Sequence, residues 1–191
     1  MELKQVKRQV LYTGRTFDLI VDDVEYPSGG RSIREIAHHP GGSVIVPLFH
    51  DRSVMLIRQL RYPLGAYIFE LPAGKLNPGE DPGTAARREL EEETGWKGRK
   101  MEKLVSMYTT PGFCDEVLHV YLATDLQESE HGHRREEGEF TMTVHRMILE
   151  HAIGMIASGE IRDGKTIVGL LLVERMLRST PTDMGIGRRD Q

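Results

Sequence analysis

The sequence has little cysteine and no long apolar run, and each shortage excludes a class of protein. Cys114 is the only cysteine, so the chain cannot form an intramolecular disulfide, as is usual in a reducing compartment. No stretch approaches the roughly 20 consecutive apolar residues of a membrane-spanning helix. The first residues, MELKQVKRQVLYTG, also lack the apolar core of a secretory signal. We therefore expect a cytoplasmic protein.

Positive charge is in short supply as well. Lysine and arginine number 25 against 29 aspartate and glutamate residues, which gives a net charge of −4. Because no basic field is available to bind a phosphate polymer, DNA and RNA are not expected as partners. The 191 residues suffice for one sizeable core. We expect a β extension over residues 1–40, a main domain over 41–180 and a polar tail over 181–191.

A short stretch near the middle of the chain carries the clearest signals of local structure. Asp81 is a favourable N-cap, and Pro82 suits the first helical position because its missing N–H has no partner there. Gly95 is typical of the position just beyond a helix end. Together these residues predict a helix from about Pro82 to Thr94.

The end of this predicted helix carries negative charge where helices usually carry positive charge. Glu89, Glu92 and Glu93 are spaced i, i+3 and i+4, so their carboxylates share one face. Each acid in the last turns opposes the helix dipole at a cost of about 0.3–1 kcal/mol. A hard cation such as Mg²⁺ would remove this repulsion. A solvated acidic surface is the alternative, and the helix geometry alone does not choose between them.

The acidic stretch resembles a known motif. Gly74, five residues, Glu80, seven residues and then RELEEETGW, which starts at Arg88, resemble the Nudix box at every defined position. The resemblance implies a Nudix hydrolase, with a three-layer α/β/α sandwich, a mixed sheet and a need for Mg²⁺ or Mn²⁺. It implies catalytic roles for Arg88, which would orient the glutamates, and for Glu92. The implied metal contacts are the carbonyl of Ala73 and the carboxylates of Glu89, Glu92 and Glu93.

Patterns of β-branched, aromatic and apolar residues predict the other elements of the fold. The predicted strands cover 6–12, 17–26, 31–38, 43–49, 53–59, 104–108, 116–123 and 140–147. The predicted helices cover 149–158 and 165–177. Residues 125–138 are polar without an apolar period, which indicates a surface loop. The two C-terminal helices carry apolar stripes, so these helices and the GEIRDGK segment between them are interpreted as fold rather than chemistry.

Segments outside the box resemble the ADP-ribose and nucleoside-diphosphate-sugar branch of the Nudix family. IRQLRY precedes FELPAGKL, and Pro111 follows the box and precedes GFCDE. The resemblance implies substrate contacts for Arg61 and Glu70. Glu116 is either a contact to a ribose hydroxyl of the substrate or a water-exposed acid at the start of a strand. Arg58 is either a further phosphate contact, because guanidinium groups bind phosphate in a bidentate manner, or a surface arginine.

The same resemblance suggests roles for the N-terminal unit and for a downstream loop. In this branch an N-terminal β unit is exchanged between the subunits of a homodimer and helps to bind the nucleotide base. Arg34 and Phe17 are candidates to stack on that base, with a surface charge and a core ring as the alternatives. A loop glutamate before the last strand serves as general base in this branch, which points to Glu137 or Glu139.

The expected reaction is hydrolysis of the diphosphate linkage of ADP-ribose or a related nucleoside-diphosphate sugar. The products would be a nucleoside monophosphate and a sugar phosphate. GDP-mannose or a dinucleotide is the alternative substrate for the same chemistry. A non-catalytic sensor of nucleotide ligands is the alternative from another class, and the complete set of box carboxylates favours the enzyme.

Overall fold

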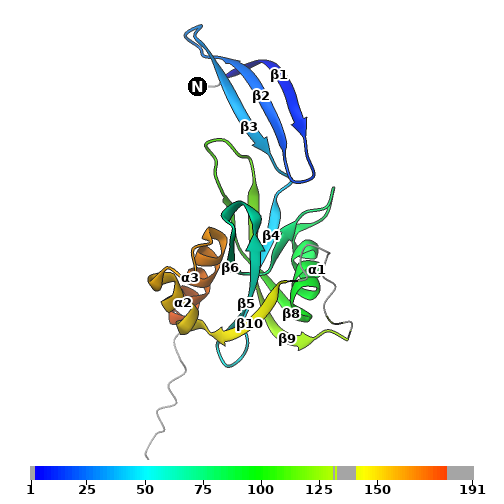
Figure 1. Cartoon of the computed structure of the whole chain (residues 1–191), viewed down its shortest axis with the longest axis vertical. Helices are drawn as coiled ribbons and strands as arrows, with labels where there is room; N and C mark the ends of the chain where they lie inside the picture. Colours follow the sequence, from blue (N-terminus) through cyan, green and yellow to red (C-terminus); the bar gives the residue numbers. More distant parts are fainter. Residues whose placement is uncertain (1–2, 131, 133–140, 180–191) are drawn as a thin grey trace, which may run out of the picture.

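The described residues of this computed structural model, 3–130, 132 and 141–179, form sheets covered by helices on two sides (Figure 1). None of the described helices is long and apolar enough to cross a membrane. The helices are α1 (Pro82–Thr94), α2 (Leu149–Ser158), α3 (Gly164–Ser179) and the 3₁₀ turn η1 (Tyr62–Leu64). The strands are β1 (Lys4–Thr13), β2 (Asp18–Glu25), β3 (Arg31–His38), β4 (Gly42–Pro47), β5 (Ser53–Arg61), β6 (Ala66–Glu70), β7 (Ala73–Lys75), β8 (Trp96–Tyr108), β9 (Val117–Glu128) and β10 (Thr143–Ile148).

Strand β4 is buried along its whole length and has an apolar cluster on each face. Val44 and Val46 contribute to a cluster with residues of α2 and α3, whereas Ile45 packs with Ala86 and Leu90 of α1. Successive side chains of a strand point to opposite faces, so a continuous apolar run is typical of a strand covered on both sides. Figure 1 shows the resulting layers, with α1 on one side of the sheets and α2 and α3 on the other.

Two sheets lie between the helix layers. The larger has the order β7-β4-β9-β8, in which β4 and β9 run parallel and the other neighbours run antiparallel. The smaller has the order β10-β5-β6 and is antiparallel. The expected α/β/α sandwich with a mixed sheet is thereby confirmed.

Strands β1, β2 and β3 form a separate antiparallel sheet that extends from one end of the molecule (Figure 1). Arg8 joins β1 to β2 by donating two hydrogen bonds, of 2.8 and 2.7 Å, to Asp22. Every residue of β1 is exposed, and the apolar side chains of Val10, Leu11 and Ile33 are 56%, 61% and 61% exposed. Exposed apolar side chains gathered on one unit are typical of a surface that contacts another protein.

Helix α1 has the predicted bounds. The Asp81 carboxylate accepts a hydrogen bond of 2.9 Å from the Thr84 N–H, which caps the first turn. Gly95 has φ of 74°, and its N–H donates to the Glu91 carbonyl at 2.8 Å. This left-handed conformation favours glycine, so the residue that predicted the helix end also produces it.

Strands β8 and β9 are longer than their sequence patterns predict. β8 begins at Trp96 rather than at residue 104, and β9 continues to Glu128, so residues 125–128 of the predicted loop are strand. Trp96 and Glu128 pair at the end of this hairpin. Several side chains here are polar and exposed, so backbone pairing holds the strands together without the apolar alternation on which the prediction relied. At the other end of the polar segment, β10 begins at Thr143.

The FELPAGK segment contributes to two strands, which belong to different sheets. β6 pairs with β5 in the smaller sheet, whereas β7 pairs with β4 in the larger sheet. Leu71 and Pro72 link them, and we call Glu70 to Ala73 the crossover. Proline has no N–H to donate to a strand ladder, which is consistent with its place between the sheets.

Candidate active site

The acidic face of α1 is organised around one arginine. Arg88 donates from Nη1 to Glu89 Oε1 at 2.6 Å and to Glu92 Oε2 at 3.0 Å. It also donates from Nε and Nη2 to the two carboxylate oxygens of Glu80, at 3.0 and 3.1 Å. The bonds to Glu80, followed by those to Glu89 and Glu92, raise the pKa of Arg88. The arginine therefore holds three carboxylates of the box near one another.

The remaining box residues bring the backbone of β7 against this face. Glu93 Oε2 accepts a hydrogen bond of 2.9 Å from the Ala73 N–H. A Cβ at Gly74 would lie 1.9 Å from Glu89 Oε1, so a side chain there would displace the carboxylate. The glycine of the motif is required because the backbone passes directly beside Glu89.

The residues present fit a hard divalent cation. Glu89 and Glu93 are only 9% and 3% exposed, and the last turn of α1 holds no basic residue. Carboxylate and carbonyl oxygens are the ligands that Mg²⁺ and Mn²⁺ prefer, and buried negative charge needs positive charge nearby. Within the described ranges no group of three or more His, Cys, Asp or Glu side chains is already arranged to hold a metal ion. Arg88 instead lies between the carboxylates of Glu89 and Glu92.

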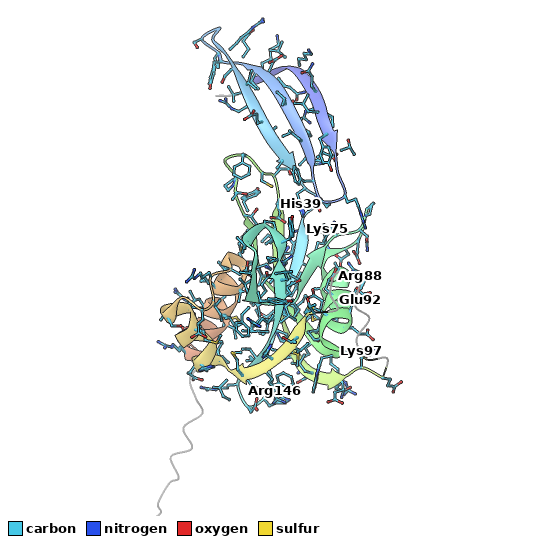
Figure 2. The ribbon with its side chains drawn as sticks, viewed as in Figure 1. His39, Lys75, Arg88, Glu92, Lys97 and Arg146 are labelled. Atoms are coloured by element: carbon cyan, nitrogen blue, oxygen red, sulfur yellow. The ribbon has the colours of Figure 1, made fainter. Side chains whose placement is uncertain are left out.

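A cavity of about 680 Å³ opens beside these carboxylates. Its lining includes Ala73 and the box residues Glu89, Glu92 and Glu93, together with residues of β5, β9 and the start of α3. Figure 2 shows Arg88 and Glu92 beside α1, and His39 and Lys75 toward the N-terminal sheet. The cavity thus extends from the acidic helix to the base of that sheet.

A second charged cluster forms another wall of the cavity. Arg61 donates from Nε and Nη2 to the two oxygens of Glu70, both at 2.6 Å, and Lys165 Nζ donates to Glu70 Oε2 at 2.7 Å. Arg61 and Lys165 line the cavity, whereas Glu70 is 1% exposed beneath them. Burial raises the pKa of Glu70, but the hydrogen bonds and charges of Arg61 and Lys165 outweigh this effect, so the net shift is downward.

Two of the predicted substrate-binding arginines lie away from this cavity in the single chain. The Arg58 guanidinium lies over the rings of Tyr67 and Phe69, 5.2 and 5.8 Å from their centroids. Arg34 lies on the N-terminal sheet, where it donates to the Tyr26 hydroxyl at 2.6 Å and to Ser32 Oγ at 2.9 Å.

The predicted substrate residue Glu116 lines the cavity beside a residue that the sequence did not point to. His39 Nδ1 lies 3.2 Å from Glu116 Oε1, and both residues line the cavity. The loop before Glu116 is fastened to the end of the N-terminal sheet, because Asp115 lies 2.6 Å from His38 Nδ1 and accepts from the His39 N–H at 2.8 Å. His39 had no signal in the sequence, since the two acids that it contacts, Asp115 and Glu116, are more than 70 residues away.

Lys165 is a further site residue that sequence reasoning missed, since its segment was assigned to the fold alone. Asp163, Gly164 and Lys165 all line the cavity. A signal was available, because a lysine in the first turn of a helix opposes the helix dipole, just as the acids at the end of α1 do. The general-base candidates Glu137 and Glu139 lie outside the described residues.

The fold and the site together define a hydrolase of the Nudix family. The family model described as the NUDIX domain matches residues 39–167, and the chain belongs to this family. This match confirms the identification made from the box.

Individual relatives cover most of the chain. The ADP-ribose pyrophosphatase of Bacillus subtilis (strain 168) is 41% identical over 87% of this chain and 89% of its own length. The methanol dehydrogenase activator of Bacillus methanolicus is 41% identical over 88% of this chain and 91% of its own length. A GDP-mannose pyrophosphatase of Shigella flexneri is 30% identical over 80% of this chain and 82% of its own length.

A solved structure described as an ADP compounds hydrolase has the same fold. It superimposes with a TM-score of 0.80 and covers 93% of this chain and 95% of its own. At 22% sequence identity this likeness concerns the fold.

Proposed function

We propose that the protein hydrolyses the diphosphate bond of ADP-ribose or a related nucleoside-diphosphate sugar, with Mg²⁺ or Mn²⁺ as cofactor. The products are a nucleoside monophosphate and a sugar phosphate. One observation carries the proposal, which is that the buried carboxylates of Glu89 and Glu93 share a cavity with the cations of Arg61 and Lys165. The relative named ADP-ribose pyrophosphatase supports this choice of substrate.

The charges of the cavity suit a diphosphate. A diphosphate next to Glu89, Glu92 and Glu93 alone would be repelled, so cations must lie between them. These three carboxylates and the Ala73 carbonyl would hold Mg²⁺, which neutralises phosphate charge and lowers the pKa of a bound water. Arg61 uses Nε and Nη2 on Glu70, which leaves Nη1 to donate to a phosphate oxygen.

Side chains of the protein accept the proton of the attacking water and keep the metal-binding carboxylates in position. Glu137 or Glu139 accepts the proton of the attacking water, a role that is worth roughly 10²–10⁴-fold in rate. Arg88 keeps Glu89 and Glu92 in position through the hydrogen bonds described above. Glu92 is the most exposed of the three metal-binding carboxylates, with 35% of its side chain accessible, and so faces the cavity most openly.

The nucleoside end is assigned to the side of the cavity near the N-terminal sheet. Glu116 would accept from a ribose hydroxyl. Arg34 and Phe17 would stack on the base in a homodimer in which two copies exchange their N-terminal sheets, because in one chain neither residue lines the cavity. The exposed apolar residues of β1 and β3 support such a dimer. Arg58 would contribute to substrate binding only if formation of the homodimer moved its guanidinium away from the rings of Tyr67 and Phe69.

GDP-mannose is the second candidate substrate, because a relative of that name is 30% identical over most of this chain. The chemistry at the metal and at the general base would be the same. The two substrates would differ in their contacts through the nucleotide base and the sugar, which residues outside the box make.

A substrate panel tests the proposal. ADP-ribose, GDP-mannose, UDP-glucose, NADH and diadenosine polyphosphates are each incubated with Mg²⁺, and the products are identified by chromatography. We expect release of a nucleoside monophosphate and a sugar phosphate, fastest from ADP-ribose, and none after chelation of the metal. Tight binding without turnover of any compound would instead indicate a ligand sensor.

A further inference from the structure

In the crossover from Glu70 to Ala73, two backbone N–H groups donate to side chains outside the sheet ladders: that of Ala73 donates to Glu93, and that of Leu71 also needs an acceptor from another element. β6 ends at Glu70, and β7 begins at Ala73. The Pro72 carbonyl accepts from the Ile45 N–H at 2.9 Å, which ties the crossover to β4. Leu71 is fully buried, so its N–H must find an acceptor elsewhere in the protein.

A threonine side chain of α3 supplies that acceptor. Thr166 Oγ1 accepts from the Leu71 N–H at 2.8 Å and donates to Asp163 Oδ2 at 2.6 Å. Asp163 Oδ2 also accepts from the Thr166 N–H at 3.1 Å, so the same carboxylate caps the helix. Thr166 has no exposed surface. Its hydroxyl therefore uses both its donor and its acceptor capacity inside the protein, and water cannot easily replace it.

The contact between α3 and the crossover leaves little room for adjustment. A Cβ at Gly169, one turn beyond Thr166, would lie 2.6 Å from Leu71 Cδ1 and 3.0 Å from Val46 Cγ2. Lys165, the residue before Thr166, donates to the Glu70 carboxylate at 2.7 Å. Two consecutive residues of α3 thus hold two consecutive residues of the crossover.

The crossover leads directly to the acidic face of α1. Ala73 is two residues beyond Leu71, and its N–H donates to Glu93 Oε2 at 2.9 Å. Pro72, which lies between them, has a fixed φ and adds little flexibility. A shift of Leu71 would therefore move the Ala73 peptide, and with it the hydrogen bond that orients the Glu93 carboxylate.

We propose that Thr166 is a positioning residue of the cation site, and that its hydroxyl fixes the crossover so that Ala73 and Glu93 present their oxygens to the metal. The inference rests on the proposed function, in which these two residues contact the cation. Partners that orient metal ligands from outside the coordination sphere are typically worth 10–100-fold in metal affinity.

The test compares Mn²⁺ binding by three variants without substrate, measured by isothermal titration calorimetry and electron paramagnetic resonance. Thr166→Val keeps the side-chain shape but removes the hydroxyl, and we expect its Kd for Mn²⁺ to rise about tenfold or more. Thr166→Ser keeps the hydroxyl and should bind within about threefold of wild type. Val173→Ala is the matched control for lost packing, because Val173 is fully buried two turns further along α3 in the same apolar cluster as Leu71, and its side chain cannot hydrogen-bond to the crossover.

Each outcome decides the matter. If Thr166→Val binds Mn²⁺ as tightly as Val173→Ala does, although both unfold at lower temperature than wild type, the positioning role is refuted. Thr166→Ala removes the hydroxyl without any risk of overpacking and answers the same question if Thr166→Val does not fold. One outcome would overturn this inference and leave the proposed function standing: wild type hydrolyses a nucleoside-diphosphate sugar, and Thr166→Val binds Mn²⁺ as tightly as wild type does. Wild-type protein that binds no Mn²⁺ would overturn the proposed function as well.

Discussion

Replacing Glu70 with glutamine would remove the buried negative charge to which both Arg61 and Lys165 donate hydrogen bonds. The Glu70 side chain is 1% exposed, and its oxygens accept three hydrogen bonds of 2.6 to 2.7 Å from these two cations. Breaking a buried ion pair by removing one partner costs about 3–5 kcal/mol. Because 43% of the Arg61 side chain is accessible to water, the lower end of that range, about 3 kcal/mol, is expected.

The loss should be visible in thermal unfolding followed by circular dichroism. For a chain of this size, about 3 kcal/mol corresponds to a decrease in Tm of roughly 6–12 °C at pH 7. Glu102→Gln, at an exposed position on β8, changes the net charge equally and should leave the Tm within about 2 °C of wild type. It is the matched control.

The difference between wild type and Glu70→Gln should also depend on pH. The folded-state pKa of Glu70 lies below its ordinary value of 4.5. A depressed pKa means that the carboxylate stabilises the fold fully above about pH 4.5 and loses this contribution as the pH falls through the lower folded-state value. The Tm difference should therefore shrink in acid. A Glu70→Gln protein as stable as wild type at pH 7, or a Tm difference that does not change with pH, would refute this reasoning.

Two further predictions concern the general base and the nucleotide base. In single-turnover assays, either Glu137→Gln or Glu139→Gln should slow hydrolysis by roughly 10²–10⁴-fold; if neither loses more than about tenfold, the loop does not supply the base. Arg34→Ala should raise KM severalfold with little change in kcat, because it removes binding remote from the reacting bond, and an unchanged KM would exclude base stacking.

The helix of the box was predictable because its determinants are local. Asp81, Pro82 and Gly95 specify its two ends through capping and backbone conformation alone. The spacing of Glu89 and Glu93 likewise places both carboxylates on one face without reference to the rest of the chain. The charge pattern alone did not decide between a metal site and a solvated acidic surface, and the Nudix motif indicated the metal site.

The second wall of the cavity was only partly predictable. Arg58 and Arg61 are three residues apart on one strand. Because side chains alternate between the two faces of a strand, these arginines lie on opposite faces, and only one of them can reach the cavity. Lys165 belongs to a helix about 100 residues beyond Arg61 in the chain. Its position in the first turn of that helix is a sign of function, but the partner, Glu70, could be found only in three dimensions.

The role of the FELPAGK segment could not be predicted from its composition. Its apolar pattern is the same whether it forms one strand or two, and Pro72 alone does not specify that the chain changes sheets. The change of sheet creates the need for Thr166, because it leaves the Leu71 N–H without a strand partner. Contacts of this kind arise from the packing of distant elements rather than from local sequence.

The central claim is that the box carboxylates bind the cation that makes diphosphate hydrolysis possible. The most direct measurement is turnover of ADP-ribose with Mg²⁺ by wild type and by Glu93→Gln, with both products identified and folding verified by circular dichroism. Glu93→Gln removes one charge and almost no volume. We predict that its kcat falls by more than about 100-fold, because a ligand to the metal contributes several kcal/mol of charge stabilisation. Hydrolysis by Glu93→Gln at the wild-type rate would contradict the account.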